Sequence, residues 1–355
     1  MTTSLHHQRK SGLQSRIFRH ALPFIGLGFV VAVLAACLTA ESDSSVVVYS
    51  SEDQICSEPI LHDFEHDSGI RVNAVYDKEA AEQVMKRLLA EKDNPQAYVY
   101  WANEPIHPDL LKEKGISTPY LSTNAQKLPA IFKDPEGYWT AFSARARVLL
   151  VNNPDPVQPT SLEAYADAQW KDRAVLANPL LNTTGFTLTA LFQLWGDERA
   201  KKFLTRIRDN GVKFSPGNSD SADAVAAGKA SFSLVDIDDA FSAKAKSHNV
   251  QIIYPDQQKN QIGLFFVANA VTLIRGGHHP DNGKKLIDYL LTPAVQRKLA
   301  YSPCAQTPLL AGIETPERVK RIENIKYMNV NYSAIRKKFD ALKPTFESWA
   351  SSLTR

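Results

Sequence analysis

Apolar and polar residues alternate in short blocks along most of the chain. Three apolar segments have the length and composition of strands: residues 46–49, 70–75 and 98–101. The helix after the first of them is expected to end at Ser68-Gly69. Between the second and third strands, residues 79–91 place apolar side chains at helical spacing. This strand–helix order predicts an α/β fold with a parallel, doubly wound sheet.

The same pattern is repeated after residue 139, and two long extended stretches bracket the repeat. One stretch covers residues 139–152 and the other covers residues 262–274. Two long strands on either side of a second α/β unit predict two lobes joined by two crossover strands. The predicted lobe 1 comprises residues 38–145 and 268–312, and lobe 2 comprises residues 146–267 and 313–355 with the C-terminal helices.

Residues 1–36 are expected to be a signal peptide and not part of the fold. Basic residues come first and an apolar segment, 21–36, follows, which is too short for a comfortable membrane span. The segment ends in Leu34-Ala35-Ala36-Cys37, which resembles the lipobox of bacterial lipoproteins. That resemblance implies cleavage before Cys37 and lipidation of Cys37. An ordinary signal peptide cut near Ala40, or an uncleaved anchor, is the alternative.

Removal of the signal peptide changes the charge of the protein. The chain has 41 basic and 38 acidic residues, but four of the basic residues and none of the acids lie within residues 1–36. The remainder has 37 basic and 38 acidic residues, a net charge of −1. No nucleic acid is therefore expected as a partner. Cys56 and Cys304 would remain beside the lipidated Cys37, either as a disulfide or as two separate buried thiols.

Three acids follow an apolar run that starts at Ser231. They are Asp236, Asp238 and Asp239, and they come directly after residues typical of a buried strand. Open α/β sheets bind ligands at the carboxyl ends of their strands, so these carboxylates are expected to face a cleft. Asp is also a good helix N-cap, and residues 240–246 suit a helix, so one of the three acids could cap it.

Several motifs resemble the ferric-iron branch of ABC-importer solute-binding proteins. They include Tyr49-Ser50-Ser51, Asp67-Ser68-Gly69-Ile70, Trp101-Ala102-Asn103-Glu104, Ala144-Arg145-Ala146-Arg147-Val148 and Ala305-Gln306-Thr307-Pro308. The resemblance covers nearly the whole mature chain. It implies a type II periplasmic-binding fold, whose two lobes close on a small solute, and ABC-transporter permease subunits as partners. It also implies an exported monomer that reaches the membrane through its lipid anchor only. The resemblance places Cys56 in the first helix of lobe 1, and Cys304 in a loop that returns to the same lobe.

The ligand residues differ from those of the ferric members. These carry two adjacent tyrosines just after the acidic strand, where this chain has Asp238-Asp239. The His or Tyr ligand often found after the first strand also has no counterpart in Ser50-Ser51-Glu52-Asp53. Glu104, Asp238 and Asp239 are therefore predicted as metal ligands, and their oxygens suit Ca²⁺, Mg²⁺ or Mn²⁺.

The sequence Asn182-Thr183-Thr184-Gly185 before a helix offers hydroxyl and free N–H groups for an anion, unless it is a plain helix cap. The resemblance puts a phosphate- or carbonate-type anion at this turn. The first hypothesis is thus a bound metal ion with a synergistic anion, and the alternative is a small zwitterion such as 2-aminoethylphosphonate. The predicted ligand-binding residues are Ser50, Ser51, Asn103, Glu104, Asn182, Thr183, Thr184, Asn218, Asp236, Asp238 and Asp239.

An enzyme is the competing class of function. Asp236-x-Asp238-Asp239 is also compatible with the metal site of a phosphohydrolase. However, the sequence has no Gly-x-Ser-x-Gly, His-Glu-x-x-His or Gly-x-x-x-x-Gly-Lys motif to accompany it. The prediction is therefore a binding protein without catalytic residues.

Overall fold

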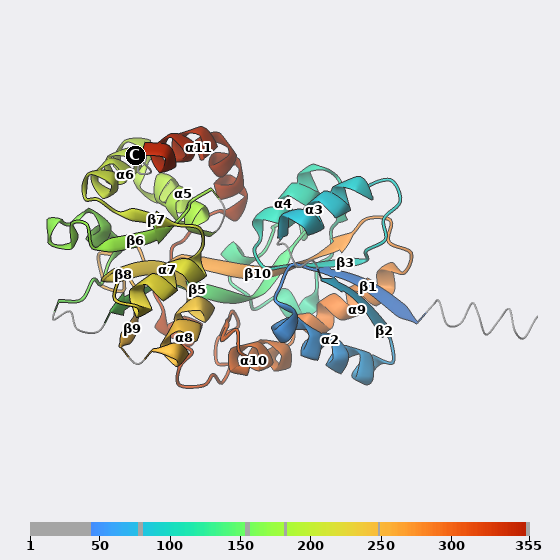
Figure 1. Ribbon diagram of the computed structural model, residues 1–355. Helices are drawn as coiled ribbons and strands as arrows, with labels where there is room; N and C mark the ends of the chain where they lie inside the picture. Colours follow the sequence, from blue (N-terminus) through green and yellow to red (C-terminus); the bar gives the residue numbers. More distant parts are fainter. Residues whose placement is uncertain (1–43, 77–80, 153–156, 181–182, 248, 353–355) are drawn as a thin grey trace, which may run out of the picture. The chain divides into compact units, whose positions relative to one another are not determined.

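The computed structural model describes residues 44–76, 81–152, 157–180, 183–247 and 249–352. In this part of the chain the strands form one continuous sheet, with helices packed against it (Figure 1). None of the described helices is both long and apolar enough to cross a membrane. Cys37 and Asn182 lie outside the described residues, so lipidation of Cys37 and ligand binding by Asn182 stay predictions.

The first lobe is built on three parallel strands in the order β2-β1-β3. Successive residues of β1 point to opposite faces, so Val48 packs with α2 and Tyr49 with α3 and α4. The strands are β1 (Ser45–Ser50), β2 (Arg71–Tyr76), β3 (Val99–Ala102) and the short β4 (Ser117–Thr118). The helices are α2 (Gln54–Ser68), α3 (Ala81–Ala90), α4 (Ile106–Glu113), α9 (Pro280–Leu290) and α10 (Pro293–Tyr301).

The second lobe repeats this plan with parallel strands in the order β8-β6-β7. Its strands are β6 (Ala174–Ala177), β7 (Lys213–Ser215), β8 (Phe232–Asp236) and β9 (Val250–Ile253). Its helices are α5 (Thr183–Trp195), α6 (Asp197–Asp209), α7 (Asn218–Ala226), α8 (Ile237–Lys246) and α11 (Tyr332–Ser352). Five 3₁₀ helices complete the described part: η1 (Thr123–Ala125), η2 (Ala130–Phe132), η3 (Leu162–Ala166), η4 (Ala168–Trp170) and η5 (Ile322–Asn324).

Two antiparallel strands, β5 (Thr140–Asn152) and β10 (Phe266–Ile274), connect the two lobes. The first part of β5 pairs with β10, and residues 147–151 of β5 pair with β8. The expected fold class, two α/β lobes joined by crossover strands, is thereby confirmed. The second extended stretch becomes a strand only at Phe266, four residues later than expected. The residue boundaries of the lobes stay a prediction.

A disulfide joins Cys56, in α2, to Cys304, in the turn that follows α10. The two Cα atoms are 6.3 Å apart although 248 positions separate the residues in sequence. The structure thus contains the disulfide, which was one of the two alternatives left open by the sequence. The short strand β11 (Thr307–Pro308) follows and pairs with β5. The disulfide therefore ties the start of α2 to a segment that leads directly to a crossover strand.

Candidate ligand-binding site

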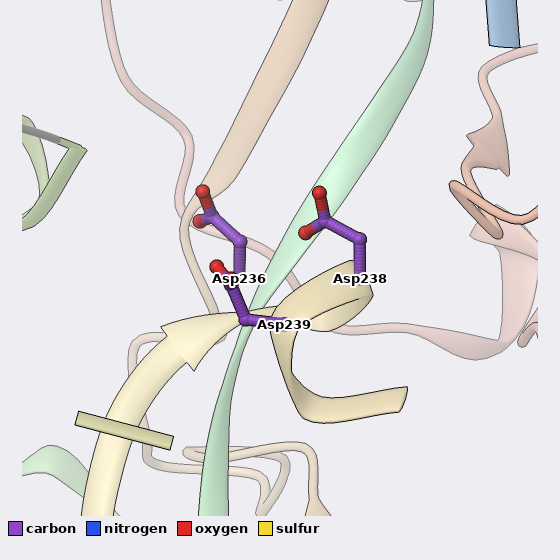
Figure 2. Close-up of side chains that lie close together, drawn as sticks. All are labelled: Asp236, Asp238 and Asp239. Carbon is purple, nitrogen blue, oxygen red and sulfur yellow. The ribbon is translucent and has the colours of Figure 1, made fainter. Parts of the chain in front are cut away.

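The candidate site lies where β8 ends and α8 begins. Asp236 is both the last residue of β8 and the N-cap position of α8, and Asp238 and Asp239 are in the first turn of the helix. The segment thus ends a strand and starts a helix, although the side chain of Asp236 makes no capping hydrogen bond. Whether the carboxylates face a ligand cleft stays a prediction. One oxygen from each of the three carboxylates lies within 4.8 Å of the others (Figure 2).

Arg147 lies on β5 directly opposite Asp236, and its side chain is fully buried. Nη1 donates a hydrogen bond to Oδ1 of Asp236 at 2.8 Å. The remaining acceptors of the guanidinium are Thr183 Oγ1 (3.1 Å), Asn218 Oδ1 (3.0 Å), Thr184 Oγ1 (2.9 Å) and the Leu234 carbonyl (3.2 Å). Arg147 is therefore a buried cation whose partners all come from the protein.

The predicted anion-binding turn at the start of α5 holds an anion of the protein itself. Thr183 Oγ1 donates to Oδ1 of Asp236 at 3.2 Å, and Asn218 Nδ2 donates to Oδ2 at 3.4 Å. Burial alone would raise the pKa of Asp236, but the charges of Arg147 and Arg145 outweigh it and hold the pKa below its ordinary value. Thr183, Thr184, Asn218 and Asp236 thus come together around the guanidinium of Arg147. Ligand binding by these four residues stays a prediction.

Arg145 lies two residues earlier on β5 and therefore on the same face of the strand. Its side chain is 13% exposed, and Nη1 is 3.4 Å from Asp236 Oδ2 and 3.9 Å from Asp238 Oδ2. Nη2 donates to the carbonyl of Asn103 at 3.1 Å. Arg145 thus contacts the strand ends of both lobes. The sequence signal for it was present, since two arginines two positions apart in an apolar strand must share a face.

Asp238 and Asp239 have too little positive charge around them to balance their own. Asp238 is 21% exposed, yet its Oδ1 is buried and has no hydrogen-bond partner among the described residues. Burial, with the charges of Asp236 and Asp239, raises the pKa of Asp238 to about 7 despite Arg145. Burial and Asp236 raise the pKa of Asp239 to about 6, although Ser219 donates to its Oδ1 at 2.5 Å. Both carboxylates would be stabilised by a cation.

Glu104 is not part of this cluster. Its Oε2 accepts from the backbone N–H of Ile106 at 2.6 Å, and its Oε1 lies 2.8 Å from Nδ1 of His107. Burial raises the pKa of Glu104, but His107 and these backbone donors outweigh it and lower the pKa. Among the residues the structure describes, the acids that could share an ion are Asp236, Asp238 and Asp239. The geometry therefore argues against Glu104 as a metal ligand, and the residue serves to start α4.

Ser51 and Asn103 hold the ends of β1 and β3 together, and Ser50 bonds to Glu52 beside them. Ser51 Oγ donates to Asn103 Oδ1 at 3.3 Å and accepts from the Asn103 N–H at 3.1 Å. Ser50 is buried, and its Oγ accepts from the N–H of Glu52 at 3.2 Å. The three residues therefore position Arg145 and Glu52 at the site. Whether they also touch a ligand stays a prediction.

Glu52 was not among the predicted site residues. It comes directly after β1, is 5% exposed, and its Oε1 accepts a hydrogen bond from Gln306 Nε2 at 2.7 Å. Burial raises the pKa of Glu52 to about 8, against the opposing charge of Arg145. Its position directly after a buried strand was the available signal in the sequence.

Residues 108–338 match the family of bacterial extracellular solute-binding proteins. The chain belongs to this family. Iron uptake protein A1 of Synechocystis sp. is 24% identical over 301 residues, which covers 81% of this chain and 82% of that protein. A putative 2-aminoethylphosphonate-binding periplasmic protein of Salmonella typhimurium is 20% identical and covers 73% of this chain and 77% of its own length.

The solved structures support the same fold. A Trichodesmium protein in complex with iron and citrate ligands superposes with a TM-score of 0.74 at 22% identity, and the match covers 87% of this chain and 99% of that one. The likeness establishes the type II periplasmic-binding fold for this solute-binding protein. Within that fold, Arg145, Asp238 and Asp239 are partly exposed and lie beside the buried ion pair of Arg147 and Asp236.

Proposed function

We propose that the chain is the lipid-anchored, substrate-binding component of an ABC importer, and that its site binds a small solute with adjoining cationic and anionic parts. One observation carries the proposal: the negative charge of Asp238 and Asp239 is incompletely balanced, and this pair of carboxylates lies beside Arg145. Membership of the extracellular solute-binding family and the N-terminal signal support export, and the family supports work with permease subunits. That the protein works as a monomer is part of the proposal.

The cationic part of the ligand would bind at Asp238 and Asp239. A cation there gives the buried Oδ1 of Asp238 the partner that the described residues do not provide. It also removes the repulsion between neighbouring carboxylates that contributes to the raised pKa of Asp238. Asp236 contributes less, because Arg147, Thr183 and Asn218 already bind it.

The anionic part would bind at Arg145. The contacts of this guanidinium with Asp236 and Asp238, at 3.4 and 3.9 Å, are longer than a good charge-assisted hydrogen bond. A ligand cation at Asp238 would weaken them further and leave Arg145 free to bind an anion. An Arg guanidinium suits phosphonate, phosphate and carboxylate oxygens because it can donate two parallel hydrogen bonds.

A zwitterion such as 2-aminoethylphosphonate is therefore the first candidate. An ammonium group needs only the two carboxylates, whereas a metal ion needs more oxygen ligands and has a permanent cation, Arg145, next to it. The Salmonella relative supports this choice. A metal ion with a counter-anion, which the sequence placed first, is the second candidate. It is favoured by the three carboxylate oxygens within 4.8 Å of one another and by the iron-binding relatives.

Titration calorimetry of wild-type and Asp238→Asn protein tests the proposal. The probes are 2-aminoethylphosphonate, MnCl₂ and ferric citrate. For the zwitterion we expect the variant to lose on the order of 1–3 kcal/mol, or roughly ten- to hundredfold in affinity, because a charged hydrogen bond becomes neutral. For a metal ligand the same change should nearly abolish binding. Unchanged affinity for the ligand that the wild type binds would place the site elsewhere. Turnover of phosphate esters with Mg²⁺ or Mn²⁺ would instead indicate a hydrolase.

A further inference from the structure

Arg336, on α11 of the second lobe, binds two acids on α4 of the first lobe. The side chains of Arg336 and Asp109 are each 8% exposed, and Nε of Arg336 donates to Oδ2 of Asp109 at 3.0 Å. Nη2 pairs with Oε2 of Glu113, one turn further along α4. Ser333 Oγ, also on α11, donates to Oδ1 of Asp109. These side chains therefore link the lobes at a place away from the two crossover strands.

Each of the two helices is fixed in its own lobe. On α11, Phe339 packs edge-on against Phe186 of α5, with ring centroids 4.9 Å apart. Lys338 Nζ, on the same helix, pairs with both carboxylate oxygens of Asp197 on α6, at 2.7 and 2.8 Å. The helix α4 packs on β3 and β4 of the first lobe. A rotation of one lobe against the other would therefore move α11 relative to α4.

The contact between α4 and α11 lies at the edge of an open space. A cavity of about 1030 Å³ is lined by Ser122 and Ile131 of the first lobe, by Gln193 on α5, and by Asn331 and Ser333 at the start of α11. The lobes thus do not pack continuously beside the contact. Charged groups at such an edge can separate when the lobes rotate, because water can replace their partners.

Both helices are also attached close to the candidate ligand-binding site. The helix α4 begins three residues after Asn103, whose carbonyl accepts a hydrogen bond from Arg145 at 3.1 Å. The helix α11 packs on Phe186, two residues after Thr184, which binds the buried guanidinium of the site. The arrangement held by the ion pairs is therefore the one in which strand ends of both lobes lie around Arg145.

We propose that Arg336, Asp109 and Glu113 form an interlobe latch, which holds the lobes in this arrangement and opens when they move apart. The latch acts on the equilibrium between lobe arrangements and not on the ligand itself. It raises the fraction of the protein in which both halves of the site are together, so its loss lowers the apparent affinity. This effect on affinity rests on the proposed function, whereas the effect on the ligand-free lobes does not.

The first test is small-angle X-ray scattering on the ligand-free protein. Arg336→Met removes every contact of the guanidinium. The double variant Asp109→Asn with Arg336→Gln leaves two amides that can bond to each other and no unpaired charge at these two positions, so it decides the question if Arg336→Met does not fold. The control, Lys338→Met, removes an ion pair of the same helix within the second lobe. We expect a larger radius of gyration in both latch variants and the wild-type radius in the control.

The second test is calorimetry with 2-aminoethylphosphonate and MnCl₂ on the same proteins. For the probe that the wild type binds, the latch variants should lose about three- to tenfold in affinity, because a smaller fraction of the protein is competent to bind. Saturation with that probe should bring their radius back to the wild-type value. A purely structural role would lower the melting temperature and change neither the ligand-free radius nor the affinity.

The outcomes separate the latch from the proposed function. A wild-type or smaller radius in the latch variants would overturn the latch, whichever probe binds. An equal expansion in Lys338→Met would also overturn it, because the loss of any ion pair on α11 would then suffice. Expanded latch variants with wild-type affinity would overturn the claim that the latch prepares the site. If the latch variants expand but the wild type binds neither probe, the latch stands and the proposed ligand class fails.

Discussion

Arg147 and Glu52 are both buried charged groups at the candidate site, but their surroundings differ. Arg147, on β5, donates to five acceptors of the protein, among them the carboxylate of Asp236. Glu52, at the end of β1, has one side-chain donor and a pKa raised to about 8 by burial. Both terminal nitrogens of Arg147 are bonded within the fold, whereas Glu52 receives a single side-chain hydrogen bond from the described residues. Incomplete bonding, more than charge itself, indicates where a ligand binds.

The same comparison separates the three aspartates of Figure 2. Asp236 is well bonded, because Arg147, Thr183 and Asn218 all donate hydrogen bonds to it. Asp238 and Asp239 have less positive charge around them, and burial raises the pKa of each. Three acids that look equivalent in the sequence therefore have two different roles. Asp236 is bonded within the second lobe, and the proposed function assigns its neighbours to the solute.

The largest effect on stability is expected when the buried ion pair of Arg147 and Asp236 is removed. Arg147→Met leaves the buried carboxylate of Asp236 without its main partner, and the free energy of unfolding should fall by roughly 3–5 kcal/mol. Denaturant titration measures this, with Arg147→Lys as the control that keeps a charge but loses the planar donor set. A fall below about 1 kcal/mol would mean that Arg147 does not stabilise the lobe in this way.

The acids with raised pKa values, Asp238 and Glu52, should make the ligand-free protein less stable as the pH rises. The pKa values of Asp238 and Glu52, about 7 and about 8, lie above those of unfolded chains, near 4. The folded protein therefore holds protons more tightly, and its melting temperature should fall between about pH 5 and pH 8. Glu52→Gln and Asp238→Asn should each reduce this slope. A melting temperature that rises over the same range in the wild type would contradict the assignment.

The smallest effect is expected at Thr184, which faces Arg147 and not the solute. Thr184→Val removes one hydrogen bond to Nη2 and should cost about 1 kcal/mol of stability. Affinity for the solute should change less than about threefold, which is under 1 kcal/mol. Thermal melts and calorimetry on the same sample give both numbers. A large loss of affinity at unchanged stability would indicate that the anionic part of the ligand binds at the start of α5, as the sequence suggested.

Strand periodicity and strand-end rules predicted much of the molecule. Buried runs located β1, β3, β6 and β8, and the rule that ligands bind at the carboxyl ends of strands located Asp238 and Asp239. The short strand β7 escaped because apolar runs that short are ambiguous. The strand in the second extended stretch starts late because its pairing with β5 begins only at Phe266, which the sequence of residues 262–265 does not reveal.

Partners across the chain were harder to predict. The spacing of Arg145 and Arg147 shows that they share a face, but not that this face meets Asp236 from a strand 89 positions away. Gln306 and Glu52 are 254 positions apart and meet only because the chain returns to lobe 1 beside the disulfide. Glu104 looked equivalent to the aspartates, and only its local bonds to His107 and Ile106 show that it is already engaged.

The central claim is that Asp238 and its neighbours bind the cationic part of the solute. Calorimetry with 2-aminoethylphosphonate and ethylphosphonate, which differ only in the amino group, tests it most directly on the wild type and on Asp238→Asn. The account predicts that the wild type prefers the amino compound at least about tenfold, roughly 1.4 kcal/mol, and that the variant loses most of this preference. Equal binding of the two compounds by the wild type, or a preference that survives in Asp238→Asn, would contradict it.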